Sequence, residues 1–167
     1  MAYAVLESPE LTFHPLDAIE QIAMANGWAC ERQGDDEIVA EVQGRVSVYR
    51  MWFAWRPDIE ALQFSSGFDV KVGRARRAAV LELLALVNAA MWLGHFELCS
   101  DDGLVAFRHT MLLRGGCGAT PEQIVDLIAG SLEASERYYP AFHFVVWGGM
   151  PPAKAMAASM METMGEA

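Results

Sequence analysis

The sequence is short of positive charge. It holds 12 lysines and arginines against 22 aspartates and glutamates, so the formal net charge at neutral pH is -10. Nucleic acids and anionic membrane surfaces are themselves negatively charged, and such a chain is repelled by both. We therefore expect no nucleic-acid partner and no membrane association.

Cysteine is also scarce. Cys30, Cys99 and Cys117 are an odd number and form no CxxC pair. Such a set suits a reducing compartment better than a disulfide framework. The stretch MAYAVLESPEL at residues 1–11 lacks the basic region of a signal peptide. The sequence predicts a cytoplasmic protein.

Catalytic and cofactor signatures are missing as well. Ser65 and Ser66 stand outside a GxSxG elbow, and the glycine-rich stretch at residues 115–123 lacks the GK[ST] ending of a phosphate loop. The adjacent acids at residues 35–36 and 101–102 fall at predicted turns and not in facing positions. We predict no catalytic residues, no cofactor and no enzymatic activity. A hydrolase or redox enzyme that uses Cys117, near a helix start, is the weakest alternative.

A metal site is not expected either. His95 and Cys99 share one face of a predicted strand but lie about 13 Å apart at roughly 3.3 Å per residue. His109 belongs to the facing strand. Zinc needs three or four converging ligands, and this spacing does not bring them together without distortion.

The elements that the pattern does predict alternate between strands and helices. They are a helix at 15–26, strands at 28–33, 37–42, 45–55 and 61–70, a helix at 78–93, strands at 95–99 and 104–113, a helix that begins at Thr120 and is kinked or broken at Pro140, and a final helix at 151–164. The short links between strands imply antiparallel pairing, so the fold class is α+β. We expect an N-terminal tail at 1–14, a single domain at 15–150, and a Met-rich C-terminal helix and tail at 151–167.

Two of these elements are unusually apolar. In the strand at 45–55 both alternating sets of side chains are mostly apolar, which indicates a central strand covered on both faces, or one face covered by a partner. The helix at 78–93 carries Glu82 as its single charge, and a helix that is apolar all round is expected to be buried all round. The sheet would take one of its faces. The other would take the helix from Thr120, the tail helix or a second copy of the chain.

Methionine is concentrated at the end of the chain, where four of the ten fall in the last twelve residues. Methionine is flexible and polarisable and is common on surfaces that adapt to partners. The predicted interaction surface consists of Trp92, Trp147, Met156, Met160 and Met164. The alternative is a tail helix that docks on the protein's own core.

Several motifs carry a resemblance to a known family. These are LxLVNAAMWLGHFEL around Asn88 and Gly94, VAFRHTMLLRGG, TPEQIxxLI, the Tyr-Tyr-Pro break at Pro140, and the WGG-x-PPxxA ending. The chain resembles the YbjN-like family, bacterial proteins that are candidate sensory transduction regulators. The resemblance covers residues 15–167. It implies a fold similar to type III secretion chaperones, a curved antiparallel sheet flanked by helices, often dimeric, with no known reaction or cofactor.

Together these patterns predict a non-enzymatic, chaperone-like protein-interaction module that works in regulation. We expect a homodimer and a further, unidentified protein partner. The alternative is a sensor that binds a small apolar ligand in a pocket between sheet and helix, lined by Trp52, Trp55 and Trp92.

Overall fold

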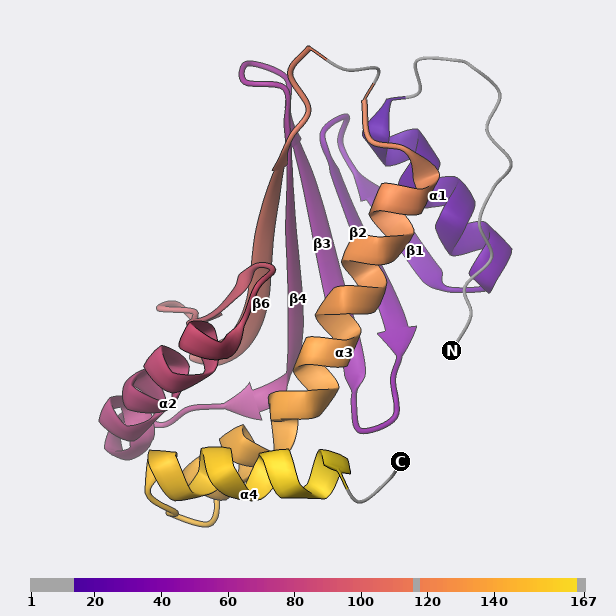
Figure 1. Ribbon diagram of the computed structural model, residues 1–167. Coiled ribbons are helices and arrows are strands. Elements are labelled where there is room, and N and C mark those ends of the chain that lie inside the picture. The colour runs from indigo at the N-terminus through magenta and orange to yellow at the C-terminus, as the bar shows by residue number, and fades with distance from the viewer. Residues whose placement is uncertain (1–13, 116–117, 165–167) are drawn as a thin grey trace.

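The computed structural model describes residues 14–115 and 118–164, so Cys117 lies outside the described residues. The elements follow the order predicted from the sequence (Figure 1). They are α1 (Pro15–Asn26), β1 (Ala29–Gln33), β2 (Glu37–Gln43), β3 (Val48–Arg56), β4 (Ala61–Lys71), a 3-10 turn (Arg74–Arg76), α2 (Arg77–Ala90), β5 (His95–Leu98), β6 (Leu104–Leu112), α3 (Pro121–Val146) and α4 (Pro152–Met164). The α+β class is confirmed.

The six strands form one antiparallel sheet in the order β1-β2-β3-β4-β6-β5. The Asp102-Gly103 signal makes the β5–β6 turn, where Gly103 has a φ of 74° and the Leu104 N–H donates to Asp102 Oδ1 at 2.9 Å. The pairing of β4 with β6 shifts register between Gly67 and Lys71. Such a bulge bends a sheet and increases its twist, as a curved sheet requires.

Helices α1 and α3 lie on the same face of the sheet, which we call the inner face (Figure 1). The core between this face and α3 is rich in aromatic rings. Phe68 on β4 packs edge-on or tilted against Tyr49, Phe96, Tyr139 and Phe142, with ring centroids 5.7–6.2 Å apart. Each such ring removes about 150–250 Å² of surface from water, so this cluster is a main source of stability.

Helix ends agree with the local sequence signals. Gly27 ends α1 in the left-handed conformation, with a φ of 66°. Thr120 and Gln123 form a complete capping box at the start of α3. Of the two outcomes predicted at Pro140, a kink or a break, the break does not occur, because α3 continues through this residue as a single helix of 26 residues. A proline costs a helix one backbone hydrogen bond, and the buried faces on both sides of Pro140 keep α3 in place.

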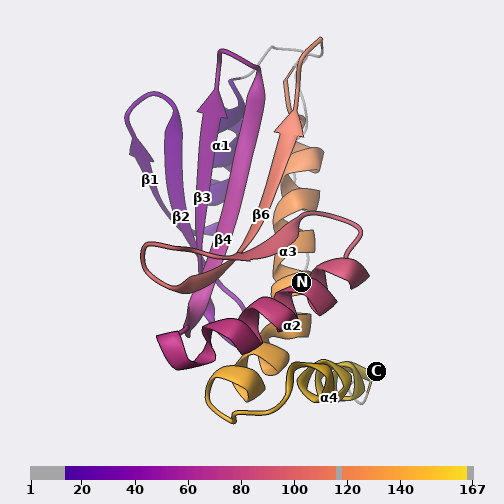
Figure 2. The same cartoon turned by 90° about the vertical axis from the view of Figure 1, so that its left-hand side faces the viewer.

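Helix α2 differs from its prediction in length and in burial. It ends at Ala90, because Met91 is extended, so Trp92 lies outside the helix. Its buried residues are Val80, Leu83, Leu84 and Val87, whereas Leu81 is 49% exposed, Leu86 37% and Trp92 92%. The expectation of burial on all sides is therefore wrong for a single chain. Helix α2 lies beside α3, α4 and β5, not across the sheet, and these neighbours cover one side of it while the other faces outward (Figure 2).

Helix α4 crosses the C-terminal part of α3 and also contacts α2 (Figure 1). Ala155 and Ser159 are fully buried on its packed side. Among the described helices, none has the length and hydrophobicity needed to cross a membrane.

Candidate interaction surfaces

The face of the sheet opposite α1 and α3, which we call the outer face, is crossed in its lower half by the β5–β6 hairpin (Figure 2). None of the described helices covers its middle (Figure 2). A trough of about 520 Å³ runs across it. The residues that line this outer trough come from β1–β4, from β6 and from the β5–β6 turn: Gln33, Val39, Val48, Arg50, Trp52, Ser65, Gly67, Phe68, Asp69, Cys99, Asp102, Leu104 and Ala106.

Two rungs of neighbouring residues make the floor of the outer trough. In the first, Trp52 on β3 lies between Val39 on β2 and Ser65 on β4. The indole N–H of Trp52 donates to Glu37 Oε2 at 3.1 Å, which fixes the ring on the sheet. Because the bond restrains the ring before any ligand arrives, less side-chain freedom is lost when the ring is contacted.

The second rung has a glycine at its centre. Gly67 lies between Arg50 on β3 and Ala106 on β6. A Cβ atom added at Gly67 would meet nothing within 4 Å, and its backbone needs no positive φ. A glycine in the middle of a strand weakens it and often marks a point where a ligand or another backbone approaches closely. Gly67 therefore opens the floor of the trough to such an approach.

The β5–β6 turn closes one end of the outer trough and carries charge. Asp102 lines it, and Arg108 Nη2 on β6 pairs with Glu97 Oε1 on β5 at 3.0 Å. Partial burial raises the pKa of the Cys99 thiol, and the charges of Asp102 and Glu97 raise it further. Since the thiolate is the nucleophile, Cys99 is poorly suited to covalent chemistry.

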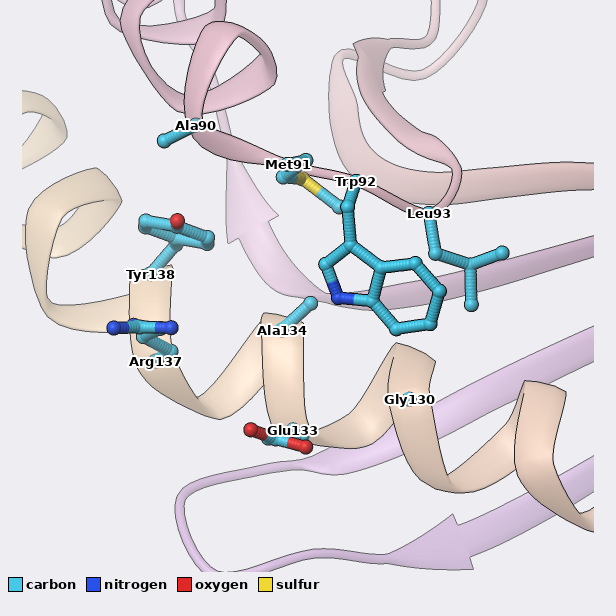
Figure 3. A pocket seen from close by; sticks show the side chains of 9 residues that line it. All are labelled: Ala90, Met91, Trp92, Leu93, Gly130, Glu133, Ala134, Arg137 and Tyr138. Atoms are coloured by element: carbon cyan, nitrogen blue, oxygen red, sulfur yellow. The ribbon is translucent and has the colours of Figure 1, made fainter.

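A second, smaller site lies around Trp92. The connection from α2 to β5 passes over α3, and a notch of about 80 Å³ opens between them (Figure 3). Leu93 packs over Gly130 on α3, while Trp92 stands beside Gly130 and Ala134 with most of its ring in solvent. Glu133 also lines this notch and is exposed.

The structure separates the members of the predicted interaction surface. Trp147 caps the C-terminus of α3 and is 53% exposed, and its ring packs against that of His143 with the centroids 4.7 Å apart and the planes tilted by 45°. Trp92 lies beside Ala134 on α3, and Trp147 is at the C-terminal end of the same helix. At 1.5 Å per residue, about 20 Å of α3 separates the two tryptophans. Met156 and Met160 are half-buried on the side of α4 that packs on the core, and the side chain of Met164 lies outside the described residues.

The three tryptophans of the predicted ligand pocket are not brought together. Trp52 lines the outer trough, Trp92 lines the notch, and Trp55 lies against His14 with ring centroids 5.9 Å apart. The aromatic core fills the space between the sheet and α3, where a pocket between sheet and helix would have to form. An open cavity exists, but on the opposite face of the sheet.

Groups that could hold a metal do not assemble within the described ranges, 14–115 and 118–164. No three histidine, cysteine or acidic side chains there converge on a common point. Burial lowers the pKa of His109, and the nearby charge of His95 lowers it further. Cys30 is exposed, and desolvation followed by the charge of Glu20 raises the pKa of its thiol.

The sequence contained one signal for the outer trough, which is the apolar character of both faces of β3. Val48 and Trp52 belong to the alternating set of β3 side chains that points away from the inner core, and Val48 is 50% exposed. Sequence reasoning missed Gly67, because a single glycine in a strand does not reveal which face it opens.

A sequence profile matches residues 15–144, more than half of the chain. The profile is that of YbjN, described as "Putative bacterial sensory transduction regulator". The chain belongs to the YbjN family. No curated protein matches its sequence.

Among solved structures, the chain is similar to one described as "Crystal structure of YbjN, a putative transcription regulator from E. coli". The two share 15% sequence identity with a TM-score of 0.51, over 71% of this chain and 84% of that one. At this level of identity the likeness concerns the fold, and it supports the curved sheet with flanking helices described above.

Proposed function

We propose that this member of the YbjN family is a chaperone-like, non-enzymatic regulator that binds an extended segment of another polypeptide in the outer trough. The observation that carries this proposal is the outer face of the sheet, where Trp52 and Val48 lie beside the bare backbone of Gly67. The exposed apolar side chains and the uncovered glycine backbone both favour a ligand that brings its own backbone close to the sheet.

The dimensions and chemistry of the trough suit such a segment. Its floor crosses several strands, so an extended chain can follow it over many ångströms. Charged side chains of both signs lie among its apolar residues: Arg50 is on the floor beside Gly67, and Asp69 and Asp102 also line the trough. Protein-binding patches combine apolar side chains, which supply affinity, with charged groups, which supply orientation.

The test uses a photo-crosslinking amino acid, p-benzoylphenylalanine, at Val48 in the producing cell. Ile59 in the β3–β4 turn is the matched control, since the two side chains are almost equally exposed, 50% and 51%, but Ile59 lies outside the trough. We expect polypeptide adducts from Val48 that are absent from Ile59 and that map by mass spectrometry to one segment of the partner.

Adducts of equal pattern and yield at both positions would contradict the proposal, since they would report random encounters. Val48 adducts that persist after Trp52→Arg would also contradict the proposal, because this substitution places a long charged side chain across the floor of the trough. Both readouts are independent of whether the protein is a monomer or a dimer.

A second candidate function is the sensing of a small ligand. The trough volume of about 520 Å³ falls within the range of roughly 300–1,000 Å³ that small-molecule sites occupy. In that case Val48 would yield adducts with a mass increase of a few hundred daltons, about the size of a drug-like ligand. The outer face, not the space between sheet and helix, would then hold the ligand.

A further inference from the structure

Acidic residues are missing from one end of the molecule, although the whole chain has a net charge of -10. The segments 70–81 and 137–161 hold six of the twelve lysines and arginines and none of the 22 aspartates and glutamates. The two segments meet in space, because the start of α2 lies beside the connection between α3 and α4 (Figure 2). There the guanidinium of Arg76 rests on the backbone of Gly149, with Nη2 2.8 Å from the place that a Cβ atom of this glycine would take. The fold therefore joins two segments that lack acids into one surface.

Four exposed side chains define this surface, which we call the basic end: Arg74, Arg76, Arg77 and Lys154. Elsewhere in the chain, four arginines pair with carboxylates at 2.7–3.1 Å: Arg32, Arg45, Arg56 and Arg108. Within the part of the chain that the structure describes, no side chain of the basic end forms an ion pair or a hydrogen bond of this kind. The charge of the basic end is therefore available to a partner.

The acids that follow these segments do not reach the basic end. Glu82 is five residues beyond Arg77, whereas side chains on a helix meet at a spacing of three or four residues. Glu162 is eight residues beyond Lys154, about 12 Å further along α4.

Two other cations of these segments lie near acids, and we leave them out of the basic end. Lys71 is at the end of β4, two residues after Asp69, where Asp102 also lines the outer trough. Arg137 lines the notch around Trp92 together with Glu133. The basic end is thus the part of the positive surface that has no acid beside it.

This concentration of like charge is unfavourable for the isolated chain. Arg74 and Arg77 lie at the N-terminal end of α2, where the helix dipole disfavours a cation. Arg76 is the N-cap residue of α2 and makes no side-chain capping bond, whereas the residues preferred at this position accept a hydrogen bond from the helix. The three arginines therefore destabilise the start of α2, and a negatively charged partner would offset this cost.

We propose that the basic end binds an acidic segment of a partner polypeptide, and that the Trp147 ring contacts an apolar side chain of the same segment. Trp147 lies two residues before Gly149 and is 53% exposed, and its ring is restrained by that of His143. Arginine binds carboxylates through two parallel N–H groups, and an exposed tryptophan is a common anchor in protein interfaces. No residue of this surface lines the outer trough, so the proposal does not depend on binding there.

A short polypeptide segment suits the basic end better than a nucleic acid or a membrane. Both of these are extended polyanions, and outside segments 70–81 and 137–161 they would meet a chain with six basic residues against 22 acids. An acidic segment can be as short as the basic end itself. Inorganic phosphate would engage the arginines but would leave the exposed Trp147 ring without a contact.

Fluorescence anisotropy with the full chain is the first test, and its probe is a fluorescein-labelled peptide of glutamates around one phenylalanine. We expect saturable binding at low ionic strength that weakens as salt is added. The double variant Arg74→Gln with Arg77→Gln should bind at least about tenfold more weakly, because each lost charged hydrogen bond costs about a factor of ten or more. The control is Arg114→Gln with Arg137→Gln, which removes the same charge from exposed arginines outside the basic end and should change the affinity by less than about twofold.

Tryptophan fluorescence is the second test, and it locates the peptide. Binding of the unlabelled peptide should change the emission of the native protein but not that of Trp147→Ala, because the other four tryptophans lie elsewhere in the fold. Replacing the phenylalanine of the peptide by alanine should weaken its binding to the native protein and leave its binding to Trp147→Ala almost unchanged.

Several results would overturn the proposal. They are the absence of saturable binding, equal binding of a peptide with glutamine in place of glutamate, and equal loss of affinity in the two double variants. Displacement of the peptide by oligothymidylate, phosphatidylglycerol vesicles or inorganic phosphate at lower concentrations than by unlabelled peptide would assign the surface to another ligand. Melting temperature gives a separate check. Arg74→Gln with Arg77→Gln should melt above the native protein, because repulsion is relieved, and a lower value would show that the arginines serve the fold and not a partner.

Discussion

Asn88 on α2 and Phe96 on β5 are joined by two hydrogen bonds. The Asn88 side-chain amide donates to the Phe96 carbonyl oxygen at 3.0 Å, and the Phe96 N–H donates to Asn88 Oδ1 at 2.8 Å. Strand β5 is an edge of the sheet, and its other side pairs with β6. The asparagine thus occupies both backbone groups of Phe96, as a neighbouring strand would. This explains a polar residue in the middle of an apolar helix and protects the edge against pairing with other chains.

Replacement of this asparagine should destabilise the fold. Asn88→Ala leaves the N–H and C=O of Phe96 without partners beside a side chain that is only 2% exposed. An unsatisfied buried group costs about 1–3 kcal/mol, so we expect the free energy of unfolding to fall by about that amount. Urea unfolding followed by circular dichroism measures it.

Asn88→Asp is the matched control for this prediction. Aspartate keeps the acceptor for the Phe96 N–H but cannot donate to the Phe96 carbonyl. Its loss of stability at neutral pH should exceed that of a neutral surface substitution, because a carboxylate then faces a carbonyl oxygen. If Asn88→Ala changes stability by less than about 0.5 kcal/mol, which is the usual surface value, the pair does not hold α2 to β5.

Gly44 gives a second prediction, from packing alone. A Cβ atom at this position would overlap the ring of Tyr49 and lie 2.9 Å from Glu136 Oε1. Tyr49 is fully buried, and Glu136 is held by Arg45, whose Nε donates to Glu136 Oε2 at 2.7 Å. Because neither neighbour can move freely, Gly44→Ala should cost about 1–3 kcal/mol.

The control is Gly73→Ala, also in a connection between elements. A Cβ atom there would meet nothing within 4 Å, and Gly73 has a φ of -73°, which alanine adopts readily. This variant should be neutral or more stable by about 0.4–1 kcal/mol, because the unfolded chain loses freedom. Equal melting temperatures for Gly44→Ala and Gly73→Ala would show that Tyr49 can give way.

Local signals in the sequence predicted the helices and strands well. Which faces of them are buried depends on contacts with elements distant in sequence, and local signals do not contain this information. Thr120 with Gln123 and the Asp102-Gly103 pair act within four residues, so their structures could be predicted. The burial of α2 depends on how far α3 and α4 reach, which no local pattern contains. The sequence pattern therefore predicts burial for a side of α2 that the structure leaves exposed. The outer trough likewise depends on which of the two apolar faces of β3 the helices cover, and the pattern left both open.

His109 gives a prediction about pH. Burial and the neighbouring His95 lower the pKa of His109 below its ordinary value of 6.5. As pH falls below 6.5, the unfolded chain therefore binds a proton at this residue that the folded chain does not yet bind. Stability should fall with pH through this window and level off below the folded pKa of His109.

The comparison that isolates this effect is His109→Gln, which does not titrate. We expect the free energy of unfolding of this variant to depend less steeply on pH between about 6.5 and 5 than that of the native protein. His95→Gln should show an intermediate slope, because burial of His109 remains while the neighbouring charge is gone. Parallel curves for all three proteins would show that His109 titrates alike in the folded and unfolded chains.

The outer trough offers a prediction in which stability and binding move in opposite directions. Gly67→Val should strengthen β4, because valine favours strands and the added side chain meets open space. We expect a gain of about 0.5–1 kcal/mol in the free energy of unfolding. The same side chain rises from the floor of the trough between Arg50 and Ala106, so it should abolish the polypeptide adducts formed from Val48. A destabilised surface variant that loses binding is common, whereas a stabilised one that loses binding requires a ligand that touches Gly67. Retention of the adducts in Gly67→Val would place the partner elsewhere.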